Sequence, residues 1–194
     1  MKKYKIIYAD PPWLYDNAGN EKSRGMARGS FPCMRIEDIK KLPVSYITND
    51  DAMIFLWATM PKLREALDVI DAWGFKYITC AFVWVKQNPK GSGIYSGLGH
   101  WVNGNAELCL LGRKGKTLER KNKAIKQIIL SPRGKHSAKP AEVRDRIVAL
   151  LGDLPRIELF AREKSDGWDV FGNEVESDIS FNDVVERKGK GRKE

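Results

Sequence analysis

The tetrapeptide Asp10-Pro11-Pro12-Trp13 combines residue types that could bind and activate an amino group on an aromatic ring. The lone pair of such an amine is delocalised into the ring, so two hydrogen-bond acceptors are needed to localise it. The Asp10 carboxylate can accept one amine hydrogen and the Pro11 carbonyl the other, which aims the lone pair at a sulfonium methyl group. Pro12 has no N–H and a fixed φ, and Trp13 offers a face on which a base can stack. The alternative is an ordinary turn followed by a core tryptophan.

The segments around this tetrapeptide indicate an α/β fold that places it at the end of a strand. Tyr4–Ala9 is a short apolar run, and two prolines then prevent the β-ladder from continuing. Residues 52–58 are continuously apolar, which is typical of a strand buried on both faces of a parallel sheet. Open α/β sheets bind ligands outside the carboxyl ends of their strands, so Asp10 stands where chemistry is expected.

The remaining segments continue this alternation of strands and helices. The positions of prolines and glycines, together with the spacing of apolar residues, predict helices over residues 36–42, 61–74 and 140–151. Runs of β-branched and aromatic residues predict strands over residues 77–85, 106–111, 124–130 and 156–161. The glycine-containing segments 14–30 and 86–104 are predicted to be lids over bound ligands, with plain disorder as the alternative.

Composition limits the classes of function. The 194 residues favour a single domain, predicted over residues 1–175, followed by a basic, flexible tail over residues 176–194. The formal net charge of +9 attracts polyanions such as nucleic acid, acidic proteins or membrane phospholipids. The three cysteines lie far apart and the amino-terminal apolar stretch is short. We therefore expect free thiols, no metal, no membrane association and a cytoplasmic location.

Several sequence motifs occur in an order that resembles a known family. They are ADPPW (9–13), FLWAT (55–59), VWVK (83–86), GHWVN (99–103), ELCLLGRKG (107–115), KP (139–140) and IELFAR…GW…GNE (157–174). Together they are similar to the MT-A70-like family, which contains the catalytic subunit of the eukaryotic messenger-RNA adenine methyltransferase and its bacterial, phage and DNA-modifying relatives. The resemblance implies a Rossmann-like class I methyltransferase fold, circularly permuted in the beta-class order, in one domain.

The resemblance also implies the reaction and the residues that carry it. A methyl group would pass from S-adenosyl-L-methionine to the exocyclic 6-amino group of adenine in a nucleic acid, in a bacterial or phage-infected cell. The catalytic residues would be Asp10, Pro11, Pro12 and Trp13. The cofactor would contact Asp10, Lys139, Glu158, Arg162, Ser165, Asn173 and Glu174, with Lys139 at the methionine carboxylate. The target base would be bordered by Phe31, Trp84, Lys86, Asn88 and Glu107, with core packing as the alternative for Phe31 and Trp84.

The sequence departs from the family pattern in two places. Lys164 and Ser165 stand where relatives often have His and Asn, which weakens the expected ribose contacts. Relatives have an acidic strand upstream of the catalytic one, and here nine residues precede Asp10. Some other group is therefore expected to cover the cofactor adenine.

Two other classes of function stay open at this point. One is a catalytically inactive, nucleic-acid-binding partner subunit of the same fold, against which the retained Asp10, Trp13, Lys139 and Asn173 argue. The other is an amino-methyltransferase that acts on cytosine or on a protein glutamine. DNA is favoured over RNA because the compact chain resembles the bacterial and phage members. A homodimer or a partner subunit would be compatible with the family.

Overall fold

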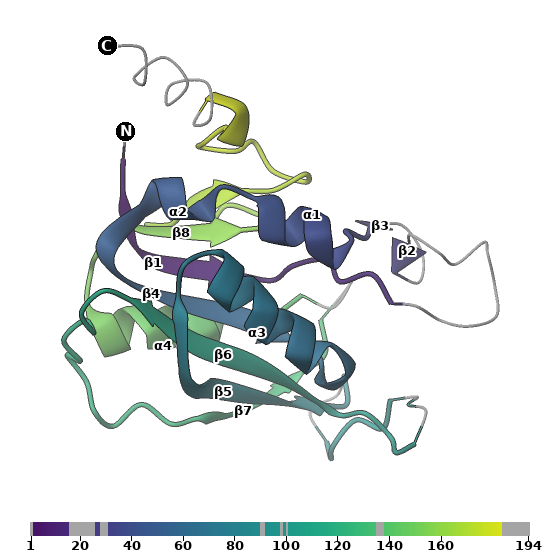
Figure 1. Ribbon diagram of the computed structural model, residues 1–194. Helices are drawn as coiled ribbons and strands as arrows, with labels where there is room; N and C mark the ends of the chain where they lie inside the picture. The colour runs from purple at the N-terminus through teal and green to yellow at the C-terminus, as the bar shows by residue number, and fades with distance from the viewer. Residues whose placement is uncertain are drawn as a thin grey trace, which may run out of the picture.

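A seven-stranded mixed sheet organises the chain in the computed structural model, which describes residues 2–15, 26–27, 31–89, 92–97, 99, 101–134 and 138–183. Within these residues the strand order is β7-β5-β6-β4-β1-β8-β9 (Figure 1). The strands are β1 (Tyr4–Ala9), β4 (Thr48–Ala58), β5 (Lys76–Gln87), β6 (Ala106–Lys114), β7 (Ile128–Pro132), β8 (Arg156–Leu159) and β9 (Asp169–Phe171). A separate antiparallel pair consists of β2 (Met26–Ala27) and β3 (Phe31–Pro32).

Strand β6 runs antiparallel to both of its neighbours, β4 and β5, whereas the other pairs in the sheet are parallel. The parallel sheet predicted from the apolar runs is therefore wrong in this part of the structure. Parallel neighbours need a long crossover, usually a helix, and no helix lies between β5 and β6 in the described residues. As a result, the carboxyl ends of β1, β4 and β5 meet the amino end of β6 at one edge of the sheet.

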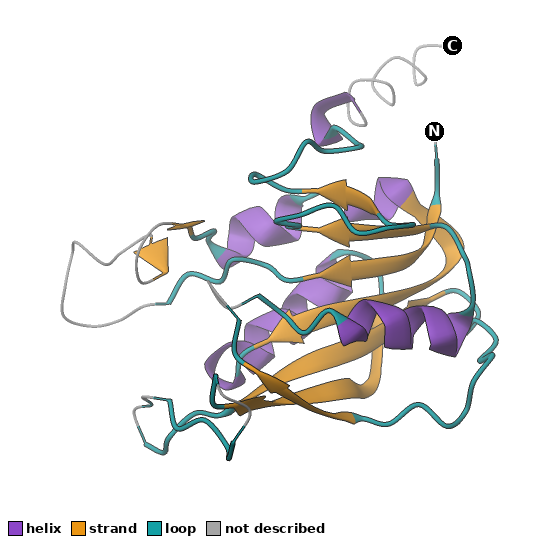
Figure 2. Cartoon of the chain, turned by 180° about the vertical axis from the view of Figure 1, so that it is seen from behind, coloured by secondary structure: helices purple, strands orange, loops and turns teal. Residues whose placement is uncertain are grey.

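Helices cover both faces of this sheet (Figures 1 and 2). One face carries α1 (Ile36–Lys41), α2 (Val44–Ile47), the 3-10 turn η2 (Met60–Lys62) and α3 (Leu63–Ala72), and the other carries α4 (Glu142–Leu151). Side chains of a strand alternate between the two faces. On β1, Ile7 joins the core cluster that includes α1–α3, whereas Ile6 and Tyr8 join the cluster that includes α4. The predicted α/β, Rossmann-like, single-domain fold is confirmed.

The observed elements differ from the predicted ones mainly at their ends and in the shortest pieces. Strand β7 starts at Ile128 rather than at residue 124, and β8 stops at Leu159 because Phe160 has a φ of 63° and cannot extend the strand. Strand β9 and helix α2 were not predicted, since three or four residues give too little periodicity to detect. Of the first predicted lid, residues 16–25 and 28–30 lie outside the described residues.

The described part of the predicted tail packs against the last strand. The Asp178 carboxylate accepts a hydrogen bond from the Val170 amide at 2.8 Å, and the rings of Phe171 and Phe181 lie 4.7 Å apart. Packing therefore continues beyond residue 175, while residues 184–194 lie outside the described part of the chain. The division into domain and tail stays a prediction. In the described residues, no helix has the length and apolar character needed to cross a bilayer.

Candidate active site

Asp10 stands at the point where β1 leaves the sheet. Strand β1 lies between β4 and β8, and Ala9 is in register with Leu56 and Leu159. Because two prolines follow, the ladder ends and the chain turns outward at Asp10. Its side chain lines three cavities of about 280, 130 and 480 Å³ at this edge. The predicted catalytic carboxylate is therefore accessible to a ligand from several sides.

The backbone after Asp10 is held in a tight turn. The Pro11 carbonyl accepts a hydrogen bond from the Trp13 amide at 2.9 Å, and the Pro12 carbonyl accepts one from the Met34 amide at 2.8 Å. The Pro11 carbonyl, predicted to receive a substrate amine, thus already has one donor. A carbonyl oxygen has two lone pairs, so one remains for a second donor.

Trp13 is both a core residue and part of a cavity wall. Only 6% of it is exposed, it packs in the core cluster of α1–α3, and its indole Nε1 donates to the Trp57 carbonyl at 3.2 Å. It also lines the 130 Å³ cavity together with Asp10. The predicted stacking surface is thus restricted to the part of the ring that faces this cavity. A larger cavity of about 630 Å³ also contacts Trp13 but does not include Asp10.

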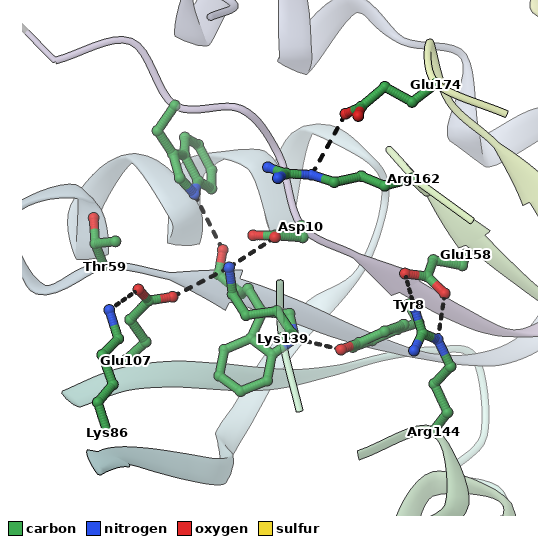
Figure 3. A network of polar contacts seen from close by, with 12 residues as sticks. Tyr8, Asp10, Thr59, Lys86, Glu107, Lys139, Arg144, Glu158, Arg162 and Glu174 are labelled. Atoms are coloured by element: carbon green, nitrogen blue, oxygen red, sulfur yellow. Dashed lines mark hydrogen bonds and ion pairs between the residues drawn. The ribbon is translucent and has the colours of Figure 1, made fainter. Parts of the chain in front are cut away.

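Asp10 and three neighbouring charged side chains form a chain of ion pairs (Figure 3). The Lys139 Nζ donates to Asp10 Oδ2 at 2.7 Å and lies 3.2 Å from Glu107 Oε2, and Glu107 Oε1 accepts from Lys86. Lys86 comes from the end of β5, Glu107 from the start of β6, and Lys139 from the segment before α4. The Lys139 and Glu107 side chains are only 10% and 7% exposed, so each charge is compensated by its neighbours rather than by water.

These neighbours fix the charge states of the two central groups. Burial alone would raise the pKa of Glu107, but the ammonium groups of Lys139 and Lys86 outweigh it and hold the pKa below its usual value. Burial would lower the pKa of Lys139, but Asp10 and Glu107 outweigh it and raise the pKa. Lys139 is therefore a firmly charged ammonium shared by two carboxylates. With three N–H donors it can still bind a third acceptor, such as an incoming carboxylate.

A second ion pair lies behind Asp10, at the end of β8. Arg144 donates through Nε and Nη2 to the two Glu158 oxygens, at 2.6 and 2.9 Å, and its guanidinium lies 5.9 Å from the Tyr8 ring centre. Burial raises the pKa of Glu158 even though Arg144 opposes the shift. Both residues line the 280 Å³ cavity. Arg144 was not predicted as a site residue, and its only signal in the sequence is a charged residue directly after apolar Val143 on a predicted helix.

The segments that follow β8 and β9 form the wall of the third cavity. Arg162, Asn173 and Glu174 line this 480 Å³ cavity together with Asp10. The Arg162 Nε lies 3.7 Å from Glu174 Oε1. The structure thus brings the predicted residues Asp10, Arg162, Asn173 and Glu174 around one space, and Lys139 and Glu158 around the adjoining 280 Å³ cavity.

Gly172 lets these two segments approach each other closely. A Cβ atom at this position would lie 1.9 Å from the Ala161 carbonyl oxygen, so the backbone would have to move. We expect Gly172→Ala to lower the free energy of unfolding by about 1–3 kcal/mol, as overpacking does, and to weaken cofactor binding. Urea unfolding measures the first effect and titration calorimetry the second. Gly104→Ala is the matched control because its Cβ would meet nothing within 4 Å. Equal stability of the two variants would contradict the contact.

Four predicted site residues that the structure describes line none of these cavities, namely Trp84, Lys86, Asn88 and Ser165. Trp84 is fully buried and donates its Nε1 to the Ser131 carbonyl at 3.0 Å, so it takes the core position that was the alternative to a substrate contact. Asn88 donates to the Ser92 carbonyl within its own loop, and the Ser165 carbonyl accepts from the Trp168 amide in a turn. The backbone of Phe31 belongs to β3, and its side chain lies outside what the structure describes.

The model of the MT-A70 family matches residues 4–174, which includes every cavity-lining residue named above. The chain belongs to the MT-A70 family. The circular permutation expected for this MT-A70 member stays a prediction, although Asp10 does precede the β8 segment in the chain.

Relatives of this MT-A70 member come from bacteria and eukaryotes. The Type II methyltransferase M.MunI of Mycoplasma sp is 35% identical over 90% of this chain and 78% of its own length. The N(6)-adenosine-methyltransferase MT-A70-like protein of Drosophila melanogaster is 29% identical over 91% of this chain, and the METTL3 catalytic subunit of Homo sapiens is 27% identical over 91%. The chain spans only 28% and 29% of the lengths of these two eukaryotic proteins.

Proposed function

We propose that this chain transfers a methyl group from S-adenosyl-L-methionine to the exocyclic 6-amino group of adenine in a nucleic acid, DNA in preference to RNA. The observation that carries the proposal is the placement of Asp10. Its carboxylate lies at a strand end, between a cavity bounded by Trp13 and cavities bounded by Lys139, Arg162 and Asn173. One carboxylate can therefore contact both reactants, which is the arrangement that a direct transfer requires.

The residues around Asp10 suit the activation of an aromatic amine. Asp10 and the free lone pair of the Pro11 carbonyl can accept the two amine hydrogens and so localise the nitrogen lone pair. When bound, the cofactor would supply a methyl group on a positively charged sulfur, whose bond to the methyl carbon breaks so that the sulfur leaves as a neutral thioether. The amine loses a proton as the N–C bond forms, and the Asp10 carboxylate stands where it can receive that proton. Lys139 compensates the charge of Asp10 until that proton arrives.

The described residues also fit the polar groups of the cofactor. Asn173, Glu174 and Arg162 offer acceptors and donors for a ribose diol and an adenine, and Lys139 has an N–H for the methionine carboxylate. The 480 Å³ cavity lies within the usual range of small-ligand sites, about 300–1,000 Å³. Asp10 borders this cavity as well and can accept from the methionine ammonium.

The preference for DNA rests on size, whereas the charge supports binding of nucleic acid in general. The chain matches 78% of the length of a Type II methyltransferase but less than a third of the N(6)-adenosine-methyltransferases compared above. Its net charge of +9 favours association with either nucleic acid. A cytoplasmic location and assembly with a second copy or a partner subunit are part of the same proposal.

Transfer of labelled methyl to DNA and RNA oligonucleotides tests the proposal. We expect label in DNA at a higher rate than in RNA, and N(6)-methyladenine as the modified base after digestion and mass spectrometry. Label in cytosine, or in a protein glutamine and not in nucleic acid, would show that the acceptor is wrong. Failure to bind S-adenosyl-L-methionine in a calorimetric titration would instead favour an inactive partner subunit.

A further inference from the structure

The loop between β5 and β6 exposes a tryptophan almost completely. Trp101 is 97% exposed and the adjacent Val102 is 77% exposed, the two highest values among the large apolar side chains described. Leaving an indole in water forgoes the stabilisation that burial of so large an apolar surface provides. An exposed apolar group of this size typically marks a binding surface.

The backbone of this loop holds Trp101 outward by tight turns. Gly97 pairs with Gly104, and a Cβ on Gly97 would lie 2.5 Å from the Gly104 carbonyl oxygen. A Cβ on Gly99 would lie 2.0 Å from the Val102 carbonyl oxygen. The two sides of the loop approach so closely at these two positions that only glycine fits. These backbone contacts therefore fix the tip that carries Trp101.

A cation lies beside the same loop. The Arg133 guanidinium lies 4.5 Å from the centre of the Tyr95 ring, and Arg133 Nη1 donates to the Tyr95 hydroxyl at 3.0 Å. Arg133 follows β7 and is exposed, so this contact fixes an arginine at the base of the loop. An arginine held over a ring keeps other N–H groups for an anionic oxygen.

The segments that contain Trp101 and Arg133 have positively charged residues and no negatively charged ones. Residues 87–106 and 128–141 contain no Asp or Glu, although the whole chain has 25 acidic residues. Of the basic residues in these stretches that the structure describes, Arg133 is exposed, whereas the Lys139 side chain is mostly buried in the ion-pair chain. An exposed arginine beside a protruding aromatic ring suits a polyanion with flat bases, because the cation can bind a phosphate while the ring stacks on a base.

We propose that the tip around Trp101, together with Arg133, binds the nucleic acid outside the catalytic cavity, with the indole stacked on a nucleobase and the guanidinium on a phosphate. The inference rests on the proposed function for the class of substrate. Strand β5 ends at Gln87 and β6 begins at Ala106, next to Lys86 and Glu107 of the ion-pair chain. The loop therefore leaves the sheet at the edge that carries Asp10, where a bound strand can contact both.

Binding of fluorescently labelled DNA oligonucleotides, followed by anisotropy without cofactor, tests this proposal. We expect Trp101→Ala to weaken binding roughly 5- to 140-fold, the range of one base–aromatic stack, and Trp101→Phe to restore part of the loss. Tyr77→Ala is the matched control, because Tyr77 is 42% exposed at the other end of β5 and should leave binding unchanged. Quenching of tryptophan fluorescence by the oligonucleotide should decrease in Trp101→Phe.

Two results would overturn the proposal. One is unchanged affinity and unchanged quenching in Trp101→Ala. The other is a wild-type dimer that dissociates on the same substitution in light scattering without nucleic acid, since Trp101 would then cover a second copy. Methyl transfer at saturating DNA separates this test from the proposed function. If the wild type transfers methyl and Trp101→Ala binds DNA with unchanged affinity, only the stacking role is refuted. If Trp101→Ala binds DNA more weakly and the wild type transfers no methyl, only the enzymatic assignment is refuted.

Discussion

Asp10→Ala is expected to lower the rate of methyl transfer by at least about 100- to 1,000-fold while the protein stays folded. The substitution removes the side-chain acceptor for the amine and leaves the Pro11 carbonyl as the remaining one. Lys139 keeps Glu107 as a partner, so no buried ammonium is left uncompensated. Single-turnover transfer of labelled methyl to DNA measures the rate, and circular dichroism with urea unfolding measures the fold.

Two further substitutions make this result specific. Asp10→Asn keeps the shape and one acceptor oxygen but loses the charge that stabilises a developing positive amine, so its rate should lie near that of Asp10→Ala. Asp68→Asn makes the same chemical change at an exposed position on α3 and should transfer methyl at the wild-type rate. A normal rate for Asp10→Ala would refute the proposed reaction centre.

The position of Asp10 could be predicted from the sequence because its signals are local. An apolar run followed by two prolines fixes the end of a strand, and the predicted bounds of β1 agree with the structure. The direction of β6 could not be predicted in the same way. Whether two strands pair in parallel depends on the connection between them, and the apolar run of a buried strand is the same in both cases.

The charge partners of the site depend on contacts between distant parts of the chain. Lys139 and Asp10 are 129 positions apart, and nothing in the sequence near Lys139 indicates that two carboxylates share its ammonium. The resemblance to the family predicted a role for Lys139 but not this arrangement. Arg144 was missed for the same reason, since its partner Glu158 lies on a different element. Trp84 was misplaced because an aromatic side chain on a strand can face either side of the sheet.

Lys139→Met should have the largest combined effect on stability and function. The substitution leaves the Asp10 and Glu107 carboxylates facing each other, with Lys86 still paired to Glu107. We expect the free energy of unfolding to fall by roughly 3 kcal/mol, the lower end of the range for a broken buried ion pair, because Asp10 keeps some exposure to water. Affinity for S-adenosyl-L-methionine and the rate of methyl transfer should fall with it, as calorimetry and the labelled-methyl assay would show.

The pH dependence separates this charge effect from a loss of packing. The pKa of Lys139 is raised, so its stabilisation is fully present below the ordinary value of 10.5 and is lost as the pH rises through the higher folded value. The pKa of Glu107 is lowered, so its stabilisation is present above the ordinary value of 4.5 and is lost as the pH falls through the lower folded value. The difference between wild type and Lys139→Met should thus be largest between about pH 5 and 10.

Below about pH 4.5 this difference should shrink, because Glu107 takes up a proton and the wild type then loses the attraction between Glu107 and Lys139. Urea unfolding at pH 3.5, 7 and 9 measures it. Lys121→Met is the matched control, since Lys121 is 56% exposed and its ion pair with Glu119 should contribute about 0.5 kcal/mol or less at any pH. A stability loss in Lys139→Met that is the same at every pH would mean that the site needs the volume of the lysine side chain, and the role assigned to its charge would be wrong.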